Sequence, residues 1–195
     1  MKKLFSNLKY TKSTISINTP LAHTQLAKEL INILLKNNIE TKNLIILCIG
    51  TDRSTGDSLG PLVGNKLEAT LPSTVKTFGT LSKPVHAVNL NDKLEYIKNN
   101  FSSPYIIAID ACLGKSKNIG KVNINEGPLK PGTGVNKSLP EVGHCQITGT
   151  VNVGGFMEFW VLQNTRLNTV FKLSLLISRG IFWAVKYLKE HNYLN

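Results

Sequence analysis

Cysteine is scarce in this sequence. Only three of the 195 residues are cysteines, Cys48, Cys112 and Cys145, and no two of them form a CxxC pair. An odd and small number of cysteines excludes a disulfide framework. A reducing, intracellular setting fits this composition best. We expect Cys48 and Cys112 to be small packing residues in the core.

Long apolar runs are also missing. The first twenty residues, MKKLFSNLKYTKSTISINTP, contain no apolar stretch long enough for a signal peptide. The most apolar late segment, residues 171–188, carries Lys172, Arg179 and Lys186. It therefore predicts a packed amphipathic helix and not a membrane span. The sequence predicts a soluble, cytoplasmic protein with no membrane partner.

Acidic residues are few, at 12 Asp and Glu against 23 Lys and Arg, for a net charge of +11. The basic residues are spread along the chain, which is typical of a solvated surface but also creates a field that attracts acidic partners. No nucleic-acid motif is present, so we do not expect direct nucleic-acid binding. A Walker loop and a GxSxG elbow are both absent, which excludes the enzyme classes that need them.

Alternating apolar and polar segments indicate the fold. Residues 44–49 form an apolar run typical of a parallel strand buried on both faces, and a polar loop (50–61) and a helix (62–71) follow. After a basic segment (1–19), residues 20–195 are expected to form one domain whose first helix is capped by Thr19. Further strands are expected at 75–78, 85–88, 105–109, 120–125 and 146–153, and helices at 91–100, 155–163 and 166–190, with Trp160 and Trp183 in the core. This alternation predicts a three-layer α/β/α sandwich with a mostly parallel sheet.

Two carboxylates fall where such sheets place their sites. Asp57 lies in the loop after the first buried strand, and Asp110 follows directly after the apolar run at 105–109. Burial and a nearby like charge both raise the pKa of a carboxyl, so the pair could share one proton and act as base and acid. The alternative is that Asp57 caps the next helix and Asp110 ties a loop together.

Three segments resemble the spore germination protease family. Residues 50–61, GTDRSTGDSLGP, resemble its Gly, polar stretch, Thr-x-Asp-x-Leu-Gly-Pro motif. Residues 108–111, AIDA, resemble its Ile-Asp-Ala strand end, and residues 131–137, PGTGVNK, resemble its Pro-Gly-Ser-Gly-Val loop. The match covers roughly residues 44–155 and is closest to the short, YyaC-type sporulation relatives. More distantly, the chain resembles the hydrogenase maturation endopeptidases.

The resemblance implies a phosphorylase/hydrolase-like fold and an atypical, aspartate-dependent endopeptidase that needs no cofactor. It implies Asp57 and Asp110 as the catalytic pair, with Thr55 orienting Asp57 and with Gly60 and Gly134 supplying backbone shapes that a side chain would forbid. Its expected partner is a peptide or protein substrate, with the small acid-soluble spore proteins as candidates in a forespore or spore core. A homo-oligomer stays open.

Two other functions stay open. One is a catalytically inactive sporulation protein that binds a peptide or protein partner; an ion pair of Arg53 with Asp57 or Asp110 would favour it. The other is a metal-dependent maturation protease, in which His144 or His86 completes a site with the two aspartates. His144 adjoins Cys145, but neighbours on a strand point to opposite faces, which argues against a cysteine nucleophile.

Overall fold

Six strands form a single sheet in the spatial order β1-β5-β6-β4-β2-β3 in the computed structural model, which describes residues 13–131 and 139–194. The strands are β1 (Ser13–Ser16), β2 (Asn43–Cys48), β3 (Lys76–Phe78), β4 (Pro104–Gly114), β5 (Lys121–Glu126) and β6 (Cys145–Val153). The neighbours β3, β2, β4 and β6 pair in parallel, whereas β5 is antiparallel to both β6 and β1. The prediction of a mostly parallel sheet is confirmed.

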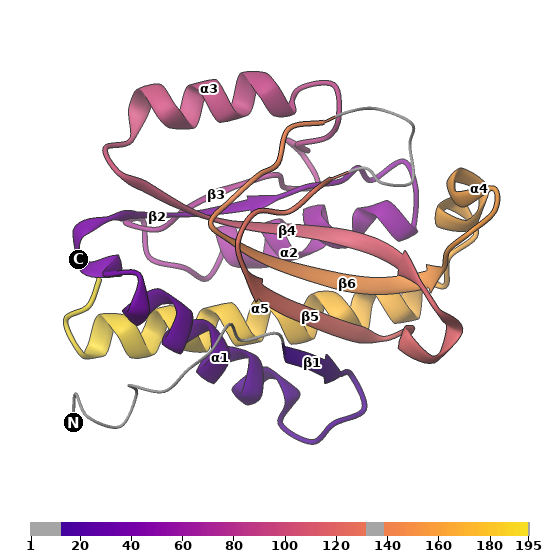
Figure 1. Ribbon diagram of the computed structural model, residues 1–195, viewed down its shortest axis with the longest axis horizontal. Coiled ribbons are helices and arrows are strands. Elements are labelled where there is room, and N and C mark those ends of the chain that lie inside the picture. The colour runs from indigo at the N-terminus through magenta and orange to yellow at the C-terminus, as the bar shows by residue number, and fades with distance from the viewer. Residues whose placement is uncertain (1–12, 132–138, 195) are drawn as a thin grey trace.

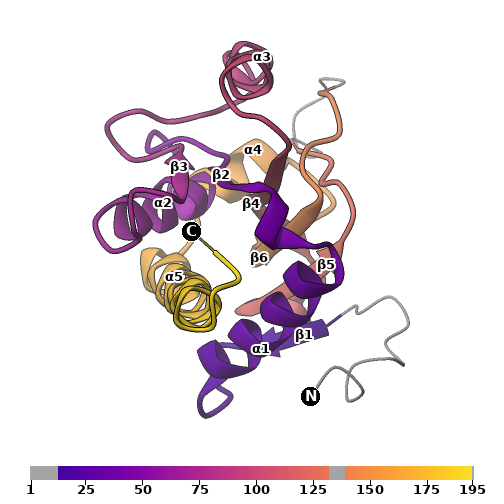
Figure 2. The same ribbon diagram turned by 90° about the vertical axis from the view of Figure 1, so that its left-hand side faces the viewer.

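Helices cover both faces of this sheet. The helices α1 (Ala22–Lys36), α2 (Leu59–Glu68) and α5 (Leu167–Glu190) lie on one face, and α3 (Leu90–Asn100) lies on the other, as Figures 1 and 2 show. The short helix α4 (Glu158–Gln163) stands beyond the end of β6, outside these layers (Figure 1). The molecule is the three-layer α/β/α sandwich expected from the alternation of strands and helices.

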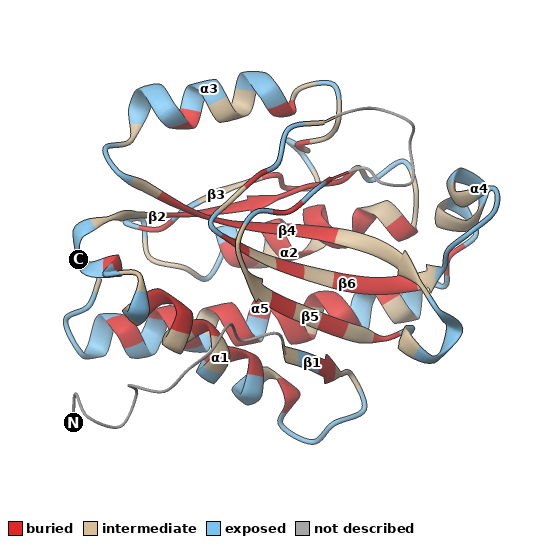
Figure 3. Ribbon diagram, viewed as in Figure 1, coloured by how far each residue is buried: buried red, intermediate tan, exposed pale blue. Residues whose placement is uncertain are grey.

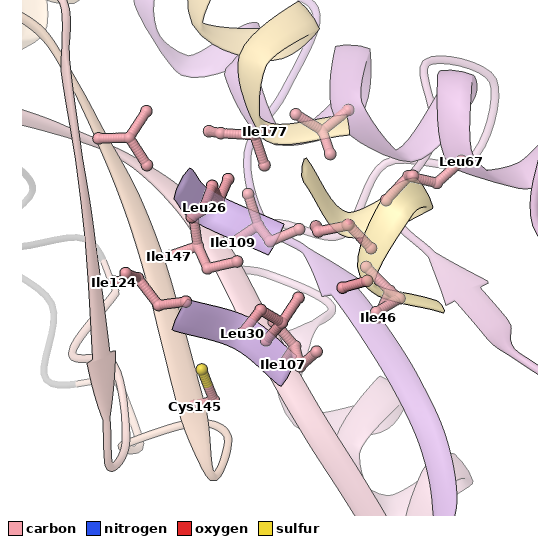
Figure 4. Close-up of a cluster of buried hydrophobic side chains, with 14 of the residues drawn as sticks. Leu26, Leu30, Ile46, Leu67, Ile107, Ile109, Ile124, Cys145, Ile147 and Ile177 are labelled. Carbon is pink, nitrogen blue, oxygen red and sulfur yellow. The ribbon is translucent and has the colours of Figure 1, made fainter. Parts of the chain in front are cut away.

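The larger core lies between the sheet and the three-helix layer (Figure 4). Apolar side chains from alternate strand positions, such as Ile107 and Ile109, pack there against Leu26 of α1 and Ile177 of α5. A smaller cluster forms on the α3 face from the intervening positions, including Ile45, Leu47 and Ile106 in the strands. Because both faces of β2 are buried, its sequence is apolar at nearly every position.

The boundaries of several elements differ from the prediction. Ser13–Ser16, in the segment before the expected domain, form β1 by pairing with β5. The first helix starts at Ala22 and not at Pro20, because Thr19 is part of a turn in which its carbonyl accepts the Ala22 N–H at 3.2 Å. Residues 85–88 form no strand, and Val85 makes only an isolated bridge with Ile49.

Two further differences affect the candidate site. The second helix begins three residues earlier than expected, at Leu59, directly after a short 3₁₀ turn at Gly56–Ser58. The strand expected to end before Asp110 continues to Gly114, because β6 extends the pairing beyond the point where β2 stops.

The expectation that both tryptophans are in the core is wrong. The exposed fractions are 56% for Trp160 and 46% for Trp183. Figure 3 shows the strands largely buried and α4 without a buried residue. Among the described helices, none combines the length and the apolar composition that a bilayer span requires.

Candidate functional site

A pocket of about 760 Å³ opens at the carboxyl ends of β2 and β4, on the face of the sheet that α3 covers. In open α/β sheets, binding sites form in the crevice outside the carboxyl ends of the strands. Asp57 and Asp110 both line it. The remaining lining residues come from the loops and strand ends around them: Thr51, Arg53, Ser54, His86–Val88, Ala111–Leu113, Pro128–Lys130, Gln146, Thr148, Glu158, Phe159 and Leu162.

Asp57 is positioned by the connection between β2 and α2. It lies within the 3₁₀ turn, whose flanking cap position is Thr55, and the cap position of α2 is Ser58. Asp57 is therefore not a helix cap. The Thr51 N–H donates to the Asp57 carbonyl oxygen at 3.2 Å and closes the loop behind it.

Gly60 lets α2 begin directly against the end of β2. A Cβ atom on Gly60 would lie 2.0 Å from the carbonyl oxygen of Ile49, far inside van der Waals contact. Gly60 thus has no room for a side chain because the backbone of Ile49 approaches it closely, and not because its φ angle is unusual. This approach sets the position of the turn that carries Asp57.

Burial raises the pKa of Asp57 above its ordinary value of 3.8. A backbone hydrogen bond from Thr51 and the charge of His86 act in the opposite direction without cancelling the effect of burial. A half-buried carboxyl with a raised pKa keeps its proton to a higher pH than an exposed one, which suits it to donate a proton.

Asp110 is positioned by the register of the sheet. The last residue of β2, Cys48, pairs with Ile109, so Asp110 is the first residue of β4 beyond the end of β2. Its neighbour on the other side is Thr148 of β6. The side chain is 7% exposed, and its Oδ1 accepts the Ala111 N–H at 2.8 Å. Asp110 is thus held at the floor of the pocket.

The two candidate histidines are separated. His86 lines the pocket, and its charge acts on Asp57. His144 does not line the pocket and lies at the amino ends of β4 and β6, where its Nδ1 accepts the Ile106 N–H at 3.0 Å and its ring stacks on Tyr105. Burial lowers the pKa of His144, with a smaller effect from Lys42. His144 thus lies four residues before Thr148, the β6 partner of Asp110, and its Nδ1 is occupied by the Ile106 N–H, so the structure does not bring it together with the two aspartates.

Three other predicted residues have different outcomes. Arg53 is exposed at the pocket rim, and within residues 13–131 and 139–194 no ion pair joins it to Asp57 or Asp110. In the part of the chain that the structure describes, no hydrogen bond joins the Thr55 hydroxyl to Asp57, and the Thr55 carbonyl oxygen accepts the Ser58 hydroxyl at 2.7 Å. Gly134 lies outside the described residues.

The described ranges contain no group of three His, Cys, Asp or Glu side chains arranged to hold a metal ion. The predicted combination of the two aspartates with His144 or His86 is therefore not assembled as a metal site among these residues.

Alternate residues of β6 contribute a part of the pocket that the sequence reasoning missed. Gln146 and Thr148 line it, while Ile147 between them faces the larger core. Cys112, expected in the core, is also a lining residue, and its Sγ lies 3.4 Å from the Thr150 hydroxyl. The alternation of polar and apolar residues in β6 is the signal that could have placed Gln146 and Thr148 on this face.

The fold is shared with a solved structure. The crystal structure of a [NiFe] hydrogenase maturation protease, HycI from Thermococcus kodakarensis KOD1, matches 78% of this chain and 99% of that one, with a TM-score of 0.52. The two sequences are 17% identical, so the likeness concerns the fold.

Sequence comparison shows the family. The protein YyaC of Bacillus subtilis (strain 168) is 49% identical over 178 residues, which cover 91% of this chain and 86% of that protein. The family model described as "Protein of unknown function (DUF1256)" matches residues 14–180, and the chain belongs to this family.

Proposed function

We propose that this protein is an aspartate-dependent endopeptidase in which Asp57 and Asp110 activate water against a peptide bond. The observation that carries the proposal is that the two carboxyl side chains, 53 positions apart in the chain, line one pocket at the carboxyl ends of adjacent parallel strands. The maturation-protease fold and the germination-protease motifs around both residues support it.

The two aspartates have different surroundings, which suit different roles. Asp57, whose pKa is raised by burial, holds a proton and donates it to the carbonyl oxygen of the scissile bond. Asp110, held by the Ala111 N–H, accepts a proton from the attacking water. When the C–N bond breaks, Asp110 gives its proton to the nitrogen, which leaves as the amine, and Asp57 takes a proton back from a hydroxyl of the tetrahedral intermediate as that becomes the new carboxyl; both aspartates then return to their first state.

This division of roles implies activity at acidic pH. Activity falls as the pH rises, when Asp57 loses the proton that it must donate. The proposed substrates are the small acid-soluble spore proteins, and the proposed location is the forespore or spore core.

The test is incubation with small acid-soluble spore proteins across acidic pH, with the fragments identified by mass spectrometry. Asp57→Asn and Asp110→Asn should each lower the rate by about 10²–10⁴-fold. Asp52→Asn is the matched control, because Asp52 is an exposed carboxyl of the same loop that does not line the pocket. Unchanged hydrolysis in both pocket variants, or no fragments from the folded native chain at any pH, would refute the proposal.

A further inference from the structure

The end of β4 has an edge beside which β2 has already stopped. β2 pairs with β4 only as far as Ile109, whose carbonyl oxygen accepts the Ile49 N–H at 2.7 Å, one residue beyond the end of β2. β4 continues to Gly114 beside β6, as Figure 1 shows. Residues 111–113 of β4 thus have β6 on one side and, in the part of the chain that the structure describes, no strand on the other. This stretch is called here the open edge.

The hydrogen bonds on either side of the open edge show which backbone groups point toward it. The Gly114 carbonyl oxygen accepts the Gly154 N–H at 2.9 Å, on the β6 side. The Ile109 carbonyl oxygen points to the β2 side instead. Successive residues of a strand direct their N–H and C=O groups to opposite neighbours. Ala111 and Leu113 therefore direct theirs to the open edge.

Most of these backbone groups have no hydrogen-bond partner. The Ala111 N–H donates to Oδ1 of the preceding Asp110 at 2.8 Å. Within residues 13–131 and 139–194, no hydrogen bond occupies the Ala111 carbonyl oxygen or the N–H and carbonyl oxygen of Leu113. Both residues are only partly buried, and both line the pocket. The open edge thus presents one donor and two acceptors, which are the groups that pair with another strand.

The open edge lies in the same pocket as the candidate catalytic turn. Asp57 and Ser54 line the pocket from the loop between β2 and α2, and Phe159 and Leu162 line it from α4. A Cβ on Gly56 would lie 2.8 Å from the Leu162 side chain, so the turn and the helix pack together. An extended segment paired with the open edge would therefore lie beside both the turn and α4.

The two faces of the sheet differ in polarity at the open edge. Leu113 and Leu162 pack at the margin of the larger core and also line the pocket. Asp110 and Thr148, which are paired neighbours in β4 and β6, line the pocket from the other face. Side chains of a strand alternate between the two faces. An added strand would thus direct one side chain toward the two leucines, where an apolar group loses its contact with water.

We propose that a substrate polypeptide binds in extended form as an added strand along the open edge, with an apolar side chain against Leu113 and Leu162. This inference rests on the proposed function, because it states how the substrate of the same site is held. The backbone groups bind the main chain of any sequence, and the leucines select the side chain. A folded segment has already paired its own backbone groups, so the substrate class is polypeptides that are unfolded at the site of cleavage.

N-methylation of a peptide tests the backbone pairing. The probe is a fluorescein-labelled nonapeptide of Ser and Thr with one central Leu, titrated with the Asp57→Asn protein and read by fluorescence anisotropy. The carbonyl oxygens of Ala111 and Leu113 accept N–H groups from two peptide residues with one residue between them. N-methylation of either should weaken binding by about tenfold, and N-methylation of the residue between them should not. The proposal is overturned if the probe does not bind, or if this alternation is absent.

Leu113→Pro removes the donor of the open edge. The Leu113 N–H takes no part in the pairing with β6, so proline costs the sheet no hydrogen bond there. Leu113→Ala is the matched control, because it removes the same side chain and keeps the N–H. Leu113→Pro should bind the probe about tenfold more weakly than Leu113→Ala. Equal binding by the two variants would overturn the proposal, and if Leu113→Pro does not fold, the N-methyl series decides alone.

Hydrogen exchange at the Leu113 N–H, followed by NMR, identifies the occupant of the open edge. This N–H should exchange rapidly in the Asp57→Asn chain alone and about tenfold more slowly when the probe is bound. Slow exchange in the chain alone would show that another part of the chain covers the open edge. Protection that rises with protein concentration would show that a second copy does. Either result would overturn the proposal.

Hydrolysis by the chain with Asp57 intact separates this inference from the proposed function. If the N-methyl series alternates as expected and spore proteins stay intact, the peptidase proposal fails and the added strand stands. If spore proteins are cleaved and Leu113→Pro has the same KM as Leu113→Ala, the added strand fails and the peptidase stands.

Discussion

Gly60→Ala tests how the fold positions Asp57. The new Cβ would lie 2.0 Å from the Ile49 carbonyl oxygen, and an ordinary contact begins at 3.4 Å, so the start of α2 must move by about 1.4 Å. Such overpacking against backbone costs about 3 kcal/mol, and the better helix propensity of Ala returns about 1 kcal/mol. The expected net loss in the free energy of unfolding is about 2 kcal/mol.

For a chain of this length, that loss lowers the melting temperature by about 4–8 °C, which a thermal melt followed by circular dichroism measures. Asn65→Ala is the control, since Asn65 is exposed in the same helix and Ala there should be neutral or stabilising by a few tenths of a kcal/mol. Because Asp57 lies in the turn before α2, Gly60→Ala should also slow hydrolysis by about 100-fold. If Gly60→Ala melts as the native chain does, close approach of α2 to β2 is not a structural requirement.

Three further predictions concern titratable residues of the pocket and its surroundings. Because burial raises the pKa of Asp57, its contribution to the free energy of unfolding is fully present below pH 3.8 and is lost as the pH rises through the folded-state pKa. Asp57→Asn should therefore raise the melting temperature at neutral pH and leave it unchanged at low pH. A uniform shift of the melting temperature at every pH would contradict this. His86→Ala should raise the pKa of Asp57 further, because the charge of His86 lowers it, and a carboxyl NMR titration that shows no change or a fall would refute the link. His144→Ala should lower the free energy of unfolding by about 1–3 kcal/mol, because it leaves the Ile106 N–H without its acceptor, and it should not change hydrolysis. Loss of hydrolysis in a folded His144→Ala variant would show that His144 takes part in the reaction.

Local patterns predicted most of the elements, and tertiary pairing changed their limits. The apolar run at 44–49 identified β2 because a strand buried on both faces has no polar alternation. The apolar run at 105–109 identified β4 but not its end, since its last five residues are held by pairing with β6, which no local pattern reveals. The expected strand at 85–88 failed for a related reason: Val85 forms an isolated bridge with Ile49, and the residues after it continue into a turn.

Residue types and order were sufficient to predict a parallel α/β sandwich and the carboxylates at its strand ends, because burial periodicity is a local property of the chain and helices that alternate with strands favour parallel pairing. Only the tertiary structure decided which side chains share the pocket. His86 lines it and His144 does not, since the His144 ring accepts the Ile106 N–H and stacks on Tyr105 instead. The exposure of Trp160 was likewise undecidable from its apolar character, because whether a helix is covered depends on what packs against it in space.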